Sequence, residues 1–298
     1  MNRFKFKGLF FIIFMIGVAF TISTINSQTQ HSKPQEHTPK QASPKQSNSS
    51  NKVSILSWNI QDFGKSKSDA TINTIANTVR NYDIVAIQEV VAGYGGSQAV
   101  AKLADALNRK GAKWDYAISY PTKSPPYKTE KYAYLWKTSK VSVNKKARLL
   151  SEVNPNVFRE PYLIGFNVGG KSIELLNYHA RKHKDKPQDE ISDIIKYLKK
   201  NKQTIIMGDF NLSETHPVWN NLYKSNYKSA LRNNRTSLKT KCKKGNYLYH
   251  SLDNIYYNDN MFSVIEADKV DLVKQCNQLK KVRRISDHLP IYVHINIL

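Results

Sequence analysis

The sequence predicts an α+β fold in which two β-sheets pack together and helices cover the outside. Short apolar runs typical of strands outnumber amphipathic helical patterns along residues 53–298. The two kinds of segment are interleaved, and no composition break suggests a second domain. Strands mixed with a few helices in this way are typical of a layered sandwich built around one core.

The strands are predicted from apolar runs and the helices from a 3.6-residue period. The predicted strands are Val53–Asn59, Asp83–Glu89, Trp114–Ser119, Lys131–Lys137, Lys140–Val143, Tyr162–Val168, Ser172–His179, Ile205–Met207, Ser251–Tyr257 and Pro290–Asn296. The predicted helices are Thr71–Asn81, Ser97–Lys110 and Asp189–Lys200. The last of these is acidic at its start and basic at its end, as the helix dipole favours.

Residues 1–27 have the pattern of a secretory signal. Basic residues precede an apolar run from Leu9 to Phe20, and small and polar residues follow it. The run is shorter than the ~20 residues that span a bilayer, and both a cleaved signal peptide and an uncleaved signal anchor remain open. No Cys lies near its end, which excludes a lipid-modified cysteine there. We therefore expect an extracellular or cell-envelope protein.

Residues 28–52 are rich in Gln, Ser, Pro, Lys and Asn and have almost no large apolar side chains. Such a segment cannot bury enough surface to offset the entropy lost on ordering, so we expect a disordered polar tether. With an uncleaved anchor, this tether would hold the protein at the membrane. The folded domain is then expected to cover residues 53–298.

Positive charge is the strongest global feature of the chain, which has 46 Lys and Arg against 23 Asp and Glu. Basic clusters occur at residues 181–184, 241–244 and 280–284. A field of this sign favours a polyanionic partner such as nucleic acid or an anionic membrane. A generally lysine-rich proteome would give the same balance, so charge alone does not identify the partner.

Two cysteines, Cys242 and Cys276, are compatible with one disulfide in an exported protein. Both flank basic segments, so a bridge between them would hold loops rather than a core. Free thiols are the alternative.

Polar side chains recur where predicted strands begin or end. In residues 205–213, "IIMGDFNLS", an apolar strand finishes in an acid and an amide, with a glycine that permits a close turn. Similar units end three other strands, interrupt one and precede the last. The side chains concerned include Asn59, Glu89, His179, Asp209, Asn211, Asp253, Asp287 and His288. Carboxylates and histidines converging on one rim of a two-sheet core are what metal-assisted hydrolysis requires.

These motifs resemble the endonuclease/exonuclease/phosphatase superfamily. The segments "SWNIQDF", "IVAIQEV", "FREPYLIGF", "LNYHARKH", "MGDFNLS", "YHSLDNIYY" and "SDHLPIYV" occur in the order seen there. The stretch "YKTEKYAYLWKTSKVSV" and the His after "LNY" are similar to the deoxyribonuclease I-like branch. The resemblance implies a four-layer α/β/β/α sandwich, with two mixed β-sheets packed face to face and helices outside. It also implies a phosphodiesterase that depends on a divalent metal.

The resemblance assigns roles to individual residues. It implies that Glu89 and Asn59 help to bind the metal, with Asp287 near it. These oxygen ligands suit Mg²⁺, with Mn²⁺ or Ca²⁺ as alternatives, better than zinc. Arg159 and Asn211 are expected to contact the substrate phosphate. Asp209 is expected to orient the water or the metal.

His179 and His288 are the expected proton-transfer groups. The resemblance pairs Glu130 with His179 and Asp253 with His288, and each carboxylate would fix the tautomer of its imidazole. The His288–Asp253 pair is favoured as the base, although the two roles are not separated by the sequence.

Three functions follow as hypotheses. The first is a secreted or surface-tethered, nonspecific endonuclease acting on DNA, which it would bind as a duplex through the backbone phosphates; no protein partner is predicted. The second is a sphingomyelinase-like phospholipid phosphodiesterase on the same fold. The third is an inactive binding module, which the full set of polar residues disfavours.

Overall fold

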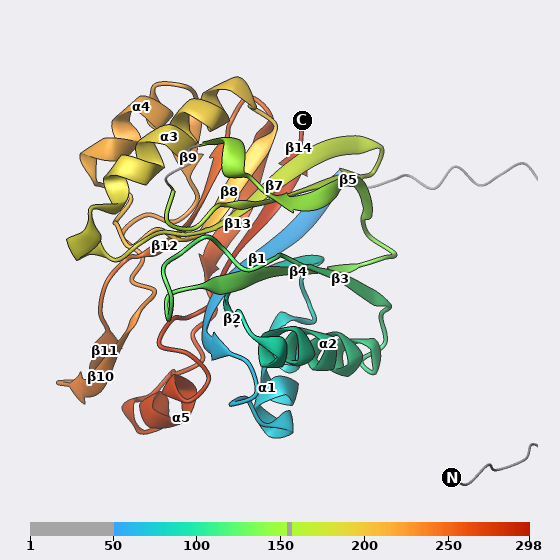
Figure 1. Ribbon diagram of the computed structural model, residues 1–298. Coiled ribbons are helices and arrows are strands. Elements are labelled where there is room, and N and C mark those ends of the chain that lie inside the picture. The colour runs from blue at the N-terminus through green and yellow to red at the C-terminus, as the bar shows by residue number, and fades with distance from the viewer. Residues whose placement is uncertain (1–50, 154–156) are drawn as a thin grey trace, which may run out of the picture. The chain divides into compact units, whose positions relative to one another are not determined.

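A computed structural model describes residues 51–153 and 157–298 (Figure 1). The expected signal, and all but the last two residues of the expected tether, lie outside these ranges. The first strand of the described residues, β1, starts at Lys52, one residue before the predicted strand. Within the described residues, no helix has both the length and the apolar character needed to cross a membrane.

Two six-stranded sheets form the centre of the molecule. The first contains, in spatial order, β13 (Phe262–Lys269), β14 (Ile291–Ile297), β1 (Lys52–Phe63), β2 (Ile84–Val91), β4 (Glu130–Lys137) and β3 (Trp114–Ile118). The second contains β5 (Ser142–Leu149), β6 (Tyr162–Val168), β7 (Lys171–His179), β8 (Thr204–Asp209), β12 (Asp253–Asn258) and β9 (Tyr227–Ser229). The β1–β2 and β7–β8 pairs are parallel and the other pairs are antiparallel, so both sheets are mixed, as expected.

Helices cover the outer faces of both sheets, which confirms the four-layer order (Figure 1). The first sheet packs against α1 (Asp69–Val79) and α2 (Tyr94–Asn108). The second packs against α3 (Pro187–Lys200), beside the short α4 (Asn220–Tyr223). The remaining helical elements in the described ranges are α5 (Leu279–Arg283) and four 3₁₀ turns: Ser151–Val153, His183–Asp185, Pro217–Trp219 and Cys276–Gln278.

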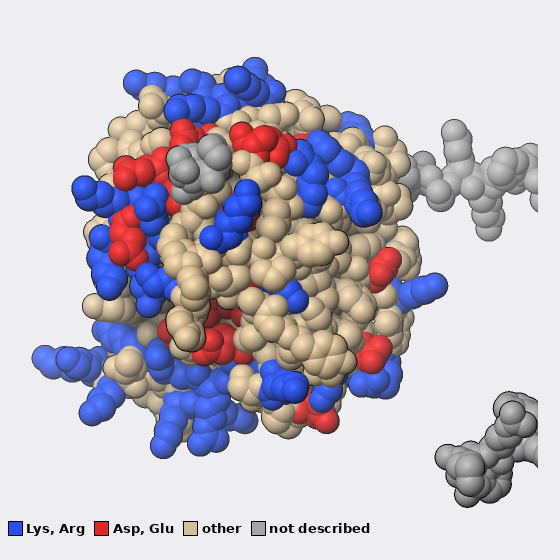
Figure 2. Space-filling view, in the orientation of Figure 1, with Lys and Arg blue, Asp and Glu red and all other residues tan. Residues whose placement is uncertain are grey.

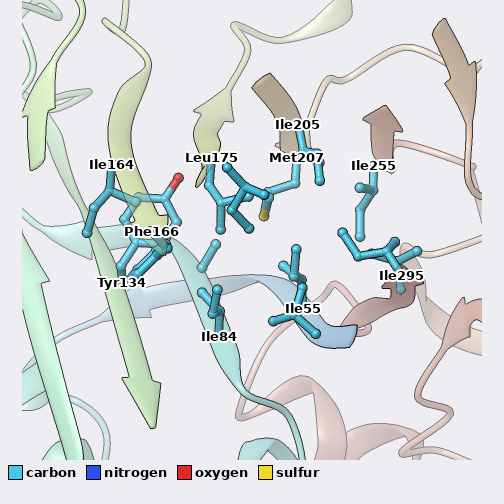
Figure 3. Close-up of a cluster of buried hydrophobic side chains, with 14 of the residues drawn as sticks. Ile55, Ile84, Tyr134, Ile164, Phe166, Leu175, Ile205, Met207, Ile255 and Ile295 are labelled. Atoms are coloured by element: carbon cyan, nitrogen blue, oxygen red, sulfur yellow. The ribbon is translucent and has the colours of Figure 1, made fainter. Parts of the chain in front are cut away.

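Side chains between the two sheets make the central core (Figure 3). Successive residues of a strand point to opposite faces. In β1, Ile55 therefore faces the other sheet, whereas Leu56 faces the helices. The same alternation places Met207 of β8 in the central core and Ile206 beneath α3. Each fully buried side chain of this kind contributes about 1.5–3 kcal/mol. Apolar packing on both faces thus fixes the middle of these strands, and the polar side chains lie at the strand ends.

Several elements are absent from the predicted set, and one predicted strand is misplaced. The strand expected at Lys140–Val143 is instead β5, which is shifted toward the C-terminus and carries mostly exposed side chains. The elements that were not predicted are β9, β13, α4, the β10–β11 hairpin (Leu238–Lys243 and Asn246–Leu248) and α5 (Leu279–Arg283). These are short or lie at sheet edges, so little apolar periodicity marks them.

A disulfide joins Cys242 of β10 to Cys276, with the two Cα atoms 5.7 Å apart. It connects the hairpin to the segment that leads into α5. A small apolar cluster that includes Leu238, Leu279 and Val282 lies between the same two segments. The bridge therefore fastens two peripheral segments, in agreement with the expectation that it holds loops.

Candidate active site

The predicted polar residues meet at one rim of the sandwich. Strand register places His179 of β7, Asp209 of β8 and Asp253 of β12 side by side in the second sheet. Asn59 of β1 and Glu89 of β2 come from the first sheet. The site is thus assembled where ends of both sheets face each other.

His179 is paired with Glu130, as the resemblance implies. Its Nδ1 lies 2.9 Å from Oε1 and 3.0 Å from Oε2 of that carboxylate. Arg159 Nε lies 3.0 Å from Glu130 Oε2 on the other side. Burial acts to raise the pKa of Glu130, but the positive charges of His179 and Arg159 outweigh it and lower the pKa. Burial also opposes the charged form of His179, yet Glu130 raises the pKa of the imidazole.

His288 is paired with Asp253 in the same way. Its Nδ1 lies 2.8 Å from Asp253 Oδ2, and that oxygen also accepts a hydrogen bond from the Thr236 hydroxyl. Burial acts to lower the pKa of His288, but Asp253 and then Asp209 raise it to about 10. In this state the imidazole is protonated at neutral pH.

Asp209 lies between the two histidines. Its Oδ2 is 3.5 Å from His179 Nε2 and 3.6 Å from His288 Nε2. The same oxygen accepts a hydrogen bond from Asn59 Nδ2 at 3.1 Å. Burial raises the pKa of Asp209, opposed by the charge of His288. The Nε2 atoms of both histidines therefore face the buried carboxylate of Asp209. The two imidazoles could each carry a proton, one on either side of a reacting group.

The turn after β8 depends on a glycine. Gly208 has a φ of 140°, and an added Cβ would collide with the carbonyl oxygen of Tyr178 on β7. Three residues later Asn211 has a φ of 51° and donates its backbone N–H to Asp209 Oδ1 at 2.9 Å. Glycine lets β7 and β8 approach closely, and the turn then fixes the Asp209 carboxylate.

Arg159 and Asn211, the expected phosphate contacts, both donate to the carbonyl oxygen of Ala180. The distances are 3.3 Å from Arg159 Nη1 and 3.0 Å from Asn211 Nδ2. The two side chains are thus adjacent, beside the His179–Glu130 pair. Their role toward a phosphate remains a prediction.

Asn59 and Glu89 fit a divalent cation. Asn59 Nδ2 donates to Glu89 Oε1 at 3.2 Å, while Asn59 Oδ1 is buried without a hydrogen-bond partner among the described residues. An unpaired buried carbonyl oxygen costs about 1–3 kcal/mol, and a hard cation would satisfy it. Glu89 has a φ of 59° where the pairing of β2 with β4 shifts register. A β-bulge therefore sets the direction of this carboxylate.

A second group could also hold a cation. One ligand atom each of Asp209, Asp253 and His288 lies within 4.8 Å of the others. Asp253 Oδ2, however, already accepts two hydrogen bonds, from His288 and Thr236. Asp287, expected near the metal, is half-buried on the loop before β14 and adds to the negative charge around His288.

Four contributors to the site were not assigned from the sequence. Thr236 binds Asp253, and the Tyr132 hydroxyl accepts the backbone N–H of His179 at 3.2 Å. Ser286 Oγ donates to the Asn59 carbonyl oxygen at 2.6 Å and accepts from the backbone N–H of His288 at 3.1 Å. The ammonium of Lys67 donates to the Ile285 carbonyl oxygen at 2.8 Å. Ser286 and Tyr132 had a signal, since Ser286 lies within the "SDH" motif and Tyr132 within the "YKTEKYAYLWKTSKVSV" stretch.

The rim is visible on the surface as a hollow with acidic side chains on its floor, and Lys and Arg gather below it (Figure 2). In the same orientation, this basic region lies where α5 and the β10–β11 hairpin are found (Figures 1 and 2).

Solved structures with the same fold differ in what their names describe. An endonuclease/exonuclease/phosphatase family protein from Leptotrichia buccalis is 18% identical and has a TM-score of 0.58, covering 82% of this chain and 99% of its own. A mannosyl-6-phosphatase from Bacteroides thetaiotaomicron is 17% identical, with a TM-score of 0.59 and coverages of 82% and 99%. D. rerio TDP2, in complex with a single-stranded DNA product, is 14% identical, with a TM-score of 0.54 and the same coverages.

No curated protein matches the sequence. A sequence profile described as "Endonuclease/Exonuclease/phosphatase family" matches residues 56–288, which include all ten of the predicted site residues. The members of this family are divalent-metal-dependent hydrolases that act on phosphate esters. The chain belongs to the endonuclease/exonuclease/phosphatase family.

Proposed function

We propose that this protein is a secreted or surface-tethered endonuclease that hydrolyses DNA without sequence preference and depends on Mg²⁺. The observation that carries the proposal is the convergence of two carboxylate-paired histidines, His179 and His288, on Asp209. The unpaired oxygen of Asn59 beside Glu89 supports the metal requirement.

Within this site the two histidines divide the proton transfers. One imidazole accepts a proton from the attacking water, and the other donates a proton to the leaving oxygen. Glu130 and Asp253 hold the rings through Nδ1, which directs each Nε2 toward the reacting group. A cation at Asn59 and Glu89 would stabilise negative charge on the phosphate. Arg159 and Asn211 would orient the same phosphate through N–H donors.

The state of His288 bears on which ring is the base. With a pKa raised to about 10, His288 is protonated at neutral pH and suited to donate. For His288 to be the base, its proton must be lost before water attack. A cation bound near Asp287 would favour that loss by charge repulsion. The test is the pH dependence of the cleavage rate at saturating Mg²⁺ for the wild type and for the residual activity of His179→Gln. Loss of the acidic limb of the profile in the variant would identify His179 as the base, and loss of the alkaline limb would identify it as the acid.

DNA is proposed as the substrate because of the positive charge around the site and because one structural relative is described with a DNA product. Contacts with backbone phosphates release counterions, so cleavage should fall steeply with salt concentration. Equal cleavage of duplex DNA at about 50 and 200 mM salt would argue against this mode of binding.

The test is a plasmid assay on the full chain with Mg²⁺, with EDTA, and with His179→Ala and His288→Ala. Supercoiled DNA should become nicked and then fragmented only with metal and both histidines. Intact plasmid under all conditions would reject the endonuclease. Export by residues 1–27 is part of the proposal, and cell fractionation with external protease treatment tests it.

A phospholipid phosphodiesterase is the second candidate, and one observation favours it. Tyr120 and Tyr127 are exposed on the loop that leads into Glu130, where aromatic rings could enter a lipid surface. Lys123 and Lys128 in the same loop suit nucleic acid as well. Hydrolysis of sphingomyelin vesicles without DNA cleavage would reverse the order. A sugar-phosphate substrate, as the name of the Bacteroides relative describes, is tested by phosphate release from monoesters.

An inactive binding module is the third candidate. Metal-dependent turnover of any of these substrates by the purified protein eliminates it.

A further inference from the structure

The β10–β11 hairpin and the segment before and within α5 form one peripheral unit beside the site. We call residues 238–248 and 274–284 together the basic platform. The disulfide joins its two segments, and Arg283 Nη1 donates to the Leu238 carbonyl oxygen at 2.8 Å. Its apolar side chains Leu238, Leu279 and Val282 pack in one small cluster. The platform is therefore a small, internally fixed body.

The platform carries positive charge and no acidic residue. Its basic residues are Lys239, Lys241, Lys243, Lys244, Lys274, Lys280, Lys281, Arg283 and Arg284. None of the ion pairs found among residues 51–153 and 157–298 involves any of them. In Figure 2 these elements coincide with the basic region below the acidic hollow. Uncompensated charge of this density attracts a polyanion.

The platform adjoins the segment that carries His288, one of the two carboxylate-paired histidines. The backbone N–H of Leu238 donates to the Asp287 carbonyl oxygen at 2.8 Å, and Ser237 forms a β-bridge with His288. One residue earlier, Thr236 holds Asp253 through its hydroxyl. A chain bound along the platform is therefore held in a fixed position relative to His288.

We propose that the basic platform binds the phosphate backbone of a nucleic acid beyond the bond that is cut. This inference rests on the proposed function for its substrate class. It adds the surface on which the rest of the polymer lies. Lys and Arg contacts of this kind carry no base specificity and make binding strongly salt-dependent.

An anionic membrane is the alternative partner for such a surface. Membrane binding normally combines basic residues with apolar side chains that enter the lipid. None of the exposed large apolar residues in the described ranges lies within the platform. The nearest is Tyr249, which packs on His250 with ring centroids 3.7 Å apart and adjoins β11. An exposed ring there suits stacking with a base. The surface chemistry thus favours nucleic acid.

The experiment compares two variants that each lose four exposed lysines. The platform variant is Lys243→Gln, Lys244→Gln, Lys280→Gln, Lys281→Gln. The control variant is Lys199→Gln, Lys200→Gln, Lys202→Gln, Lys224→Gln, at the α3 and α4 side of the molecule. Binding of a fluorescent 20-base-pair duplex is measured by anisotropy in EDTA from about 50 to 300 mM salt. Thermal unfolding establishes that both variants are folded.

The platform variant should bind at least about tenfold more weakly at 150 mM salt, with a salt slope shallower by about 2–4. The control variant should change less than about threefold. Equal losses in both variants would show diffuse attraction and overturn the proposal, as would unchanged binding by the platform variant. Loss of binding to phosphatidylserine vesicles without loss of DNA binding would assign the surface to membranes. Binding needs no hydrolysis, so an inactive plasmid assay would reject the endonuclease separately from this surface.

Discussion

The substitution Asp253→Asn tests how the site is held together. Asp253 is buried, and its Oδ2 accepts hydrogen bonds from His288 Nδ1 and from Thr236. Asparagine has the same shape and can accept both bonds, so the substitution removes mainly the negative charge. It should lower the pKa of His288, which now stands at about 10 against 6.5 for the free side chain.

The size of the effect follows from that pKa. Raising it from 6.5 to about 10 corresponds to at most about 5 kcal/mol of stability, at about 1.4 kcal/mol per unit. Asp253 is the largest of three carboxylates that raise it, ahead of Asp209 and Asp287, so its share is about 2–3 kcal/mol. Because the folded-state pKa is the higher one, this stability is complete below about pH 6.5. It is lost as the pH rises through about 10.

The assay is urea unfolding of the wild type and Asp253→Asn in EDTA at pH 6, 8 and 10.5. The difference in unfolding free energy should be about 2–3 kcal/mol at pH 6 and should shrink toward pH 10.5. Asp105→Asn, an exposed carboxylate on α2, serves as the control and should change stability by less than about 0.5 kcal/mol. A difference that stays constant or grows with pH would refute the assignment of a protonated His288.

Three further predictions concern the turn, the disulfide and the metal. Gly208→Ala should lower the unfolding free energy, measured by thermal unfolding, by more than about 2 kcal/mol. The control Gly111→Ala, also at positive φ but with open space around it, should lower it by about 1 kcal/mol. Equal losses would exclude the close approach of β7 and β8 as the reason. Cys242→Ser with Cys276→Ser should lower the unfolding free energy by about 3–4 kcal/mol for a sequence separation of 34, and an unchanged urea midpoint would contradict this. Asn59→Ala should weaken Mn²⁺ binding in calorimetry at least about tenfold; unchanged binding would move the cation to the other candidate group.

The central strands and most of the site were predictable because two sequence patterns occur together there, the alternation of side chains along each strand and the polar residues at the strand ends. Alternation along strands such as β1 and β8 separates the core face from the helix face, and polar residues then mark where each strand ends. The register of β7, β8 and β12 then places His179, Asp209 and Asp253, which are far apart in the sequence, next to one another. Family motifs supplied the pairing of each histidine with its carboxylate, which periodicity alone does not contain.

The missed parts lack that signal for physical reasons. The β10–β11 hairpin and α5 bury only a small apolar cluster, and a disulfide holds them together. β13 is an edge strand in which only Phe262 is fully buried, so its alternation is weak. Thr236 acts through one hydroxyl from a segment without regular structure. Its role depends on a tertiary contact with Asp253 that no local pattern records.

Around the two histidines, each negatively charged carboxylate has a positively charged or hydrogen-bonding partner. Glu130 lies between His179 and Arg159, and Asp253 faces His288. In the group formed by Asp209, Asp253 and His288, the Asp253 Oδ2 atom already accepts hydrogen bonds from His288 and Thr236, so less of its charge is left for a cation.

The other side of the site has excess negative charge. The side chain of Glu89 is joined to the end of β1, since the backbone N–H of Asp62 donates to Glu89 Oε2 at 3.2 Å. Lys67 is near these carboxylates and Asp287, but burial outweighs their attraction and lowers the pKa of its ammonium. One partly buried lysine therefore faces three carboxylates beside the unpaired oxygen of Asn59. A divalent cation adds most stability where negative charge is least compensated, so the charge distribution favours the Asn59–Glu89 end of the rim as the metal position.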